Sequence, residues 1–200
     1  WKFFNVLDYE DKIGMLNRGI LEYTKPLEIM KFRHADSMIN LEGKLCNYCV
    51  TPNHKLYIKE KKKYKLKEAE LLFQKSKEFR TSSRFMGTKL FRTNSRLFMH
   101  GLILSTGICR DNKIYIKNKM ENIVNLLKKL NVKFRSSNNY IIISSLSIDS
   151  LIPKWLFKLS TLKIRYFING IFNKNNEYYT SNSRIIDKIQ QLIIHAGYQS

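Results

Sequence analysis

The sequence predicts an α+β protein in which a module of short strands precedes a domain of alternating helices and strands. In roughly the first 70 residues, short apolar or alternating segments are separated by turns, and no helical period develops. Beyond residue 97, apolar residues recur at three- and four-residue spacing, and the order of elements begins again near residue 164. We therefore expect a strand module over 1–74, a basic connector over 75–96 and a second domain over 97–200.

Charge is the dominant feature of the composition. The chain has 36 Lys and Arg against 16 Asp and Glu, a formal net charge of +20. So many positive charges repel one another and favour an anionic partner such as nucleic acid, because binding releases counterions. The competing interpretation is a coding bias toward Lys, Asn and Ile. The hydrophobic content of 44% and the 8 Gly and 3 Pro residues exclude a disordered chain.

The cysteine count and the apolar runs bear on the compartment. Three cysteines form no disulfide framework and indicate an intracellular, reducing compartment, whether cytoplasm, nucleus or organelle stroma. The longest apolar run, 140–143, is too short to cross a membrane. The chain opens at Trp1 without a signal peptide, so we expect a start that is not a native N-terminus.

The first module is expected to be all-β. Asn17-Arg18-Gly19 predicts a hairpin turn, with the glycine supplying a positive φ. The lysine-rich run 59–63 predicts a solvated turn between strands. The expected strands are, in order, 3–7, 13–16, 20–23, 27–32, 37–41, 45–50 and 55–58.

The second domain is expected to contain an internal repeat whose second copy is cut short. Both copies run from a buried helix through a strand and a Tyr-x-x-Asn segment, at 115–118 and 179–182, into an amphipathic helix. The first copy comprises a helix ending near Gly107, a strand at 113–117, a helix at 118–130, a hairpin of 132–134 with 140–143, and a helix at 149–159. The second copy comprises a helix at 164–172, a strand at 177–180 and a helix at 183–196.

Thr51 and His54 are the candidate catalytic pair of the first module. The segment Val-Thr-Pro-Asn-His at 50–54 places a hydroxyl and an imidazole three residues apart across a turn. Such a pair can polarise a peptide bond: the imidazole donates a proton to the leaving nitrogen while the hydroxyl bonds the same group. On their own, a Thr and a His at this spacing are equally typical of an ordinary turn.

Two segments of this module resemble inteins, the hedgehog/intein (Hint) family of protein-splicing domains. The sequence WKFFNVLDYEDKIG at 1–14 is similar to an early block of that family, and VTPNHKLYI at 50–58 is similar to the block whose Thr and His assist the first acyl shift. Residues 1–70 also resemble, among inteins, those found in large RNA polymerase subunits. The resemblance implies host exteins joined in cis. The Cys or Ser nucleophile and the closing His-Asn block are not in the sequence, so we expect no splicing from this chain as it stands.

The second domain resembles the LAGLIDADG (DOD-type) homing endonucleases. The segments 101–107 and 170–176 are similar to the two signature helices, and 152–160 and 178–198 resemble segments that flank the second one in intein endonucleases. The resemblance implies an αββαββα repeat and Mg²⁺ held by one carboxylate from each copy. Thr106 and Asn175 occupy those two positions, and Asp111 falls in the following loop. We therefore expect no metal site and no DNA cleavage; as an alternative role, both residues would cap helix ends.

The same resemblance implies a curved sheet that faces double-stranded DNA. Lys113, Lys117, Lys133 and Arg135 would lie on its strands and bind phosphates, with the protein acting as a monomer. An alternative function is that of a LAGLIDADG-derived RNA-binding helper of intron splicing, which needs no acidic residues but leaves the strand module unexplained. A third is a purely structural remnant within a host protein.

Overall fold

The computed structural model is a mixed α+β structure whose chain divides into two compact units. It describes residues 2, 4–43, 47–73, 75, 78–80, 82–88, 93–111, 113–117, 121–137, 139–144, 152–172 and 177–198. One unit, here called the helical unit, comprises Trp1–Asn5, Ile13–Thr24 and Ser82–Ser200. The other, the strand unit, comprises Val6–Lys12 and Lys25–Thr81. Within the described ranges, no helix has the length and apolar character needed to span a membrane.

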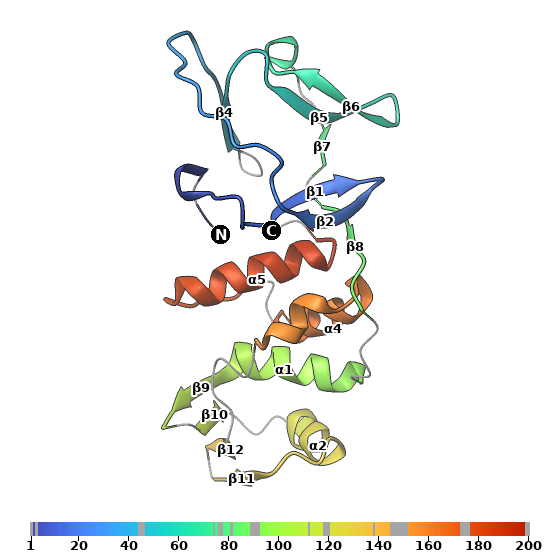
Figure 1. Cartoon of the computed structure of the whole chain (residues 1–200). Helices are drawn as coiled ribbons and strands as arrows, with labels where there is room; N and C mark the ends of the chain where they lie inside the picture. The colour runs from blue at the N-terminus through green and yellow to red at the C-terminus, as the bar shows by residue number, and fades with distance from the viewer. Residues whose placement is uncertain are drawn as a thin grey trace. The chain divides into compact units, whose positions relative to one another are not determined.

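Three helices form the centre of the helical unit: α1 (Asn94–Thr106), α4 (Thr161–Ile171) and α5 (Ser183–His195) (Figure 1). Side chains cap two of them. The Thr93 hydroxyl accepts a hydrogen bond from the backbone of Arg96, and the Asn182 side chain accepts bonds from the first turn of α5. Helix α1 ends at Thr106 with Gly107 as its C-cap, close to the end that the sequence predicts. Leu97, Leu102, Ile164, Phe167 and Leu192 are among the residues that these helices bury in a shared core.

Helices α1 and α4 start side by side and cross at two glycines. The Lys163 ammonium donates to the Asn94 side chain at 2.9 Å, which joins the two helix starts. A Cβ atom added to Gly101 would lie 2.0 Å from the carbonyl oxygen of Phe167, and one added to Gly170 would lie 2.1 Å from that of Phe98. Only glycine permits so close an approach of two helix backbones.

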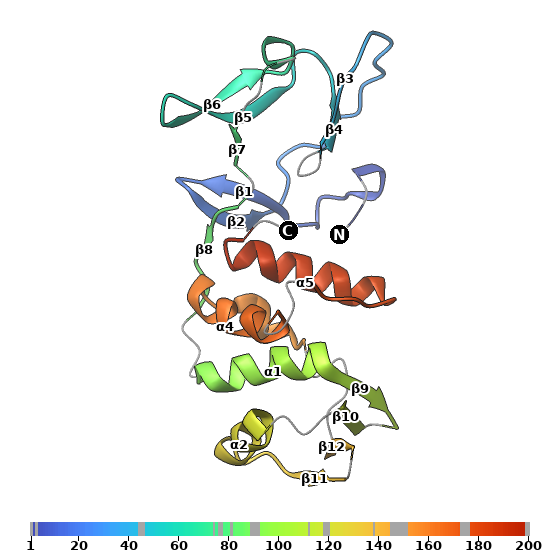
Figure 2. The ribbon, with the colours of Figure 1, turned by 180° about the vertical axis from the view of Figure 1, so that it is seen from behind.

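A four-stranded antiparallel sheet follows α1, with strand order β11-β12-β10-β9 (Figure 2). Helix α2 (Glu121–Lys129) lies between its second and third strands in the sequence, and its Ile123 and Leu127 join the core. Residues 94–144 thus have the element order αββαββ over the described residues. The strands are β9 (Gly107–Arg110), β10 (Lys113–Lys117), β11 (Phe134–Ser136) and β12 (Tyr140–Ser144).

A second sheet of the helical unit joins two distant parts of the sequence. The hairpin of β1 (Ile13–Asn17) and β2 (Ile20–Thr24) pairs through β2 with β8 (Arg84–Phe85). The turn residues Arg18 and Gly19 both have positive φ, at 47° and 85°. This hairpin is part of the helical unit, whereas the sequence predicts it within the strand module that ends at residue 74. It belongs to the helical unit because its partner strand and the helix that it contacts lie beyond residue 74.

The strand unit contains two small sheets. One pairs β3 (Ile39–Glu42) with β4 (Asn47–Val50); the other has the order β6-β5-β7, from β6 (Lys63–Glu68), β5 (Lys55–Glu60) and β7 (Glu78–Phe79). A short 3-10 helix, η2 (Glu70–Leu72), follows β6. Lys61 and Lys62 form the predicted turn between β5 and β6, both with positive φ. Ile58, Ala69 and Leu72 are the buried apolar residues described in this unit.

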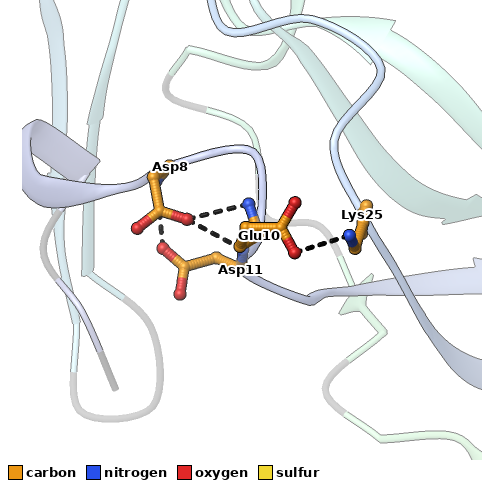
Figure 3. Close-up of polar contacts among 4 residues, drawn as sticks. All are labelled: Asp8, Glu10, Asp11 and Lys25. Carbon is orange, nitrogen blue, oxygen red and sulfur yellow. Dashed lines mark hydrogen bonds and ion pairs between the residues drawn. The ribbon is translucent and has the colours of Figure 1, made fainter.

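An acidic turn of the strand unit closes on itself (Figure 3). The Asp8 carboxylate accepts hydrogen bonds from the backbone of Glu10 and Asp11, and the Asp11 carboxylate accepts one from the backbone of Asp8. Lys25 pairs with Glu10 at 2.7 Å on the surface. The hydrogen bonds to Asp8 and Asp11 satisfy backbone N–H groups of the turn, so these carboxylates stabilise the turn itself.

Four of the expected elements are wrong over the described residues. Residues 4–6 form a 3-10 helix, η1 (Phe4–Val6), and 27–32 form no strand; Leu27 and Phe32 are largely exposed and lack a partner strand that would order them. Residues 177–180 form no strand. The helix expected at 149–159 is only the short η3 (Lys154–Lys158), because Pro153 is extended with ψ at 153° and cannot continue a helix. Residues 149–151 lie outside the described residues.

Candidate nucleic-acid interface

The two faces of the four-stranded sheet have opposite character. Ile114 and Ile116 of β10 pair with Ile143 and Ile141 of β12, and all four side chains are buried in the core. Because side chains alternate along a strand, the residues between them point to the other face, here called the outer face. The outer face is lined by Ile108, Arg110, Lys113, Tyr115, Lys117, Arg135, Tyr140, Ile142 and Ser144.

The outer face is basic and carries no acidic residue on its strands. Arg110 pairs with Lys113 across β9 and β10, Lys117 lies at the other end of β10, and Arg135 lies on β11; all four are exposed. The four strands contain no Asp or Glu, and no carboxylate of the described residues forms an ion pair with these cations. Their charges are therefore uncompensated within the described structure, which suits a polyanion.

Three of the four predicted DNA contacts lie on this face. Lys113 and Lys117 occupy the two ends of β10, separated by about 13 Å at the rise of an antiparallel strand, and Arg135 lies two strands away. Lys133 is exposed but lies just before β11, so the expectation that it sits on a strand is wrong. The arrangement can contact several phosphates at once.

The centre of the outer face is apolar and aromatic. Ile108, Tyr115 and Ile142 are directly opposite one another across β9, β10 and β12, and Arg135 ends the row on β11. Tyr140 lies diagonally to Tyr115, with ring centroids 6.2 Å apart at 89°. Ile108 is 46% exposed.

Sequence reasoning missed Arg110, Tyr115 and Tyr140 as parts of this surface. The signal for Arg110 is the segment Arg-Asp-Asn-Lys at 110–113, since a two-residue Asp-Asn turn is typical of a tight hairpin. Asp111 does lie in that turn, with φ at 49°. The tyrosines are found only when the register of β10 on β12 is known, because each strand alone leaves open which residues lie side by side.

Thr106 provides no ligand for a hard cation in this structure. It is the last residue of α1, and its hydroxyl donates to the Leu102 carbonyl oxygen at 2.7 Å, within its own helix. Asn175, its predicted counterpart, lies outside the described residues. Among those described, no group of three or more His, Cys, Asp or Glu side chains is arranged to hold a metal ion. Mg²⁺ does not fit a neutral, internally bonded hydroxyl of this kind.

Thr51 and His54 lie on one tight turn between β4 and β5. The His54 backbone donates to the Thr51 carbonyl oxygen at 3.0 Å, and the backbones of Ala69 and Glu70 fasten the turn by donating to His54 and Pro52. The Thr51 hydroxyl donates to the Asn53 side chain at 2.7 Å, and the His54 side chain is exposed. No hydrogen bond between the Thr51 and His54 side chains is present in the described part of the chain. The turn presents the imidazole to solvent.

No protein-family model matches the chain, and no curated protein sequence matches it.

Proposed function

We propose that the helical unit binds double-stranded DNA through the outer face of its four-stranded sheet without cleaving it, as a LAGLIDADG-type domain that has lost its acidic metal ligands. In the same proposal, the strand unit derives from the protein-splicing domain of an intein. The chain would then be a fragment of an intein with an inactive homing endonuclease.

The observation that carries the DNA-binding proposal is the uncompensated charge of the outer face. Arg110, Lys113, Lys117 and Arg135 are exposed on a sheet without acidic residues. By contrast, lysines of the strand unit face carboxylates: Lys59 pairs with Glu78, and Lys65 and Lys67 lie 3.6 and 3.8 Å from Glu60. A polyanion releases counterions when it binds cations that have no internal partner.

The crossing of α1 and α4 supports the LAGLIDADG assignment. The same difference in residue number relates Asn94 to Lys163, Phe98 to Phe167 and Gly101 to Gly170. Where the helices run together, Asn94 contacts Lys163, Phe98 contacts Gly170, and Gly101 contacts Phe167. The same offset relates Thr106 to Asn175, the two positions where the resemblance expects acids. Helices α1 and α4 start side by side and cross at equivalent glycines. This arrangement supports an internal repeat whose two copies once formed a shared metal site.

The intein part of the proposal depends on the two sequence blocks and on the turn that carries Thr51 and His54. The turn holds an exposed imidazole at a fixed place between two strands. That geometry is compatible with general acid catalysis at a neighbouring peptide bond.

Salt-titrated binding to a 24-base-pair duplex tests the DNA-binding proposal. We expect tight binding at low salt. The magnitude of the slope of log affinity against log salt should decrease by about one for each outer-face cation that is removed, as in Lys113→Gln, Lys117→Gln and Arg135→Gln. Lys65→Gln and Lys67→Gln are matched controls, because each removes one charge from a lysine beside Glu60. Equal losses in both sets would show that net charge alone drives binding, and tighter binding to an RNA hairpin would favour the intron-splicing alternative.

A further inference from the structure

The apolar row at the centre of the outer face needs an explanation that phosphate binding does not give. Phosphates are bound by cations and hydrogen-bond donors, and a duplex exposes charged backbone and polar base edges. Of Ile108, Tyr115 and Ile142, only the Tyr115 hydroxyl can donate to a phosphate, and partly exposed apolar surface of this kind marks contact sites in soluble proteins.

The position of the row relative to the cations suggests its partner. Arg110 and Lys113 lie one side-chain position away on one side of the row, and Lys117 lies one position away on the other, about 7 Å in each direction. The Tyr115 ring lies between these cations, and Tyr140 is directly opposite Lys117 on β12. An aromatic surface between bound phosphates suits unpaired bases, because every base has a face that can stack while its backbone stays on the cations.

Resting on the proposed function, we propose that Tyr115 and Tyr140 form a stacking surface for unpaired bases. The outer face then binds a nucleic acid with locally unpaired bases more tightly than an intact duplex of equal length and charge. The strand unit offers a comparison: the Tyr57 and Tyr64 rings are stacked on each other, with centroids 5.2 Å apart, but the neighbouring Lys59 is paired with Glu78. The Arg80 guanidinium also lies over the Tyr64 ring, 5.5 Å from its centroid, so one face of that ring is already occupied.

Two probes with the same number of phosphates test this inference on the full chain. One is an intact 24-base-pair duplex; the other carries four central T·T mismatches. We expect the mismatched probe to bind roughly tenfold more tightly by fluorescence anisotropy, from one or two stacked bases. Tyr115→Leu with Tyr140→Leu keeps apolar volume on the sheet but removes the rings, so it should abolish the preference and leave binding to the intact duplex unchanged. Tyr115→Phe with Tyr140→Phe should retain the preference, and Tyr57→Leu, with thermal melts of each variant, is the control.

The outcomes separate this inference from the proposed function. Equal binding of the two probes, or a preference that survives the double Leu variant, would overturn the stacking surface while leaving phosphate binding intact. Failure of both probes to bind at low salt would overturn both proposals.

Discussion

Gly101 and Gly170 occupy equivalent places in α1 and α4, and each lies against the carbonyl of the phenylalanine that precedes the other glycine by three residues. The contact is reciprocal: Gly101 meets Phe167, and Gly170 meets Phe98. Both neighbours are backbone atoms, which cannot rotate aside as a flexible side chain can.

Gly101→Ala is therefore expected to destabilise the helical unit by about 3 kcal/mol, because the added methyl would lie 2.0 Å from the Phe167 oxygen and force the helices apart. At an unconstrained helix position the same change stabilises by up to about 1 kcal/mol, so the sign itself is diagnostic. Urea unfolding followed by Trp155 fluorescence, with Trp1 replaced by Phe, measures the change.

Gly14→Ala is the matched control for that experiment. Its added Cβ would meet the end of the Leu21 side chain at 3.3 Å, in an exposed strand, and that side chain can move. We expect a change within about 0.5 kcal/mol. A Gly101→Ala variant as stable as this control would show that α1 and α4 do not cross as described.

Local patterns predicted most helices and strands of the helical unit. The strand at 113–117 is confirmed residue for residue, since alternation fixes both its bounds and its faces. The helices expected at 164–172 and 183–196 are confirmed to within a few residues, because their apolar spacing and the positive φ of Gly197 are local signals.

Long-range pairing could not be read from the sequence. The hairpin 13–24 was expected in the strand module, yet Tyr23 contacts His195 and β2 pairs with β8. The segment 177–180 has the sequence pattern of a strand but forms none in the structure. For the outer face, Lys113 and Lys117 were predictable from alternation, whereas the pairing of Tyr115 with Tyr140 depends on a register that only the folded sheet supplies.

His195 is expected to make stability depend on pH. Its Nε2 lies 2.8 Å from the Tyr23 hydroxyl, its ring stacks on Phe85 at 4.0 Å, and Nδ1 has no partner among the described atoms. Burial lowers the pKa of His195 from 6.5 to about 4.

As pH falls below 6.5, the unfolded chain takes up a proton that the folded His195 refuses, so stability is full above that pH and is lost down to about pH 4. We expect a loss of about 2 to 3 kcal/mol over this window, measured by urea unfolding between pH 7.5 and 4.5. His195→Gln should flatten that part of the profile, whereas His54→Gln, at an exposed site, should leave it unchanged. If the free energy of unfolding depended on pH in the same way in the wild type and in His195→Gln, His195 would not be the cause of the pH dependence.

Mg²⁺ is expected to produce no cleavage by this chain. Thr106 is bonded to the Leu102 carbonyl, and neither matching position has a carboxylate that could hold Mg²⁺ at a scissile phosphate. A plasmid carrying an uninterrupted host site, incubated with the protein and Mg²⁺, should remain supercoiled on a gel. Specific nicking that depends on Mg²⁺ would show that acids elsewhere in the chain form the metal site.

The splicing role proposed for His54 can be tested in a chain to which an intein's Cys nucleophile is joined upstream and a His-Asn block downstream. We expect His54→Ala to slow N-terminal cleavage by at least about 100-fold, because an exposed imidazole on a fastened turn is the proton donor available to the leaving nitrogen. His34→Ala is the control: that side chain is also exposed but bonds to the Ser37 carbonyl. Thiol-induced cleavage followed by mass spectrometry gives both rates, and equal rates for the two variants would exclude His54 from the mechanism.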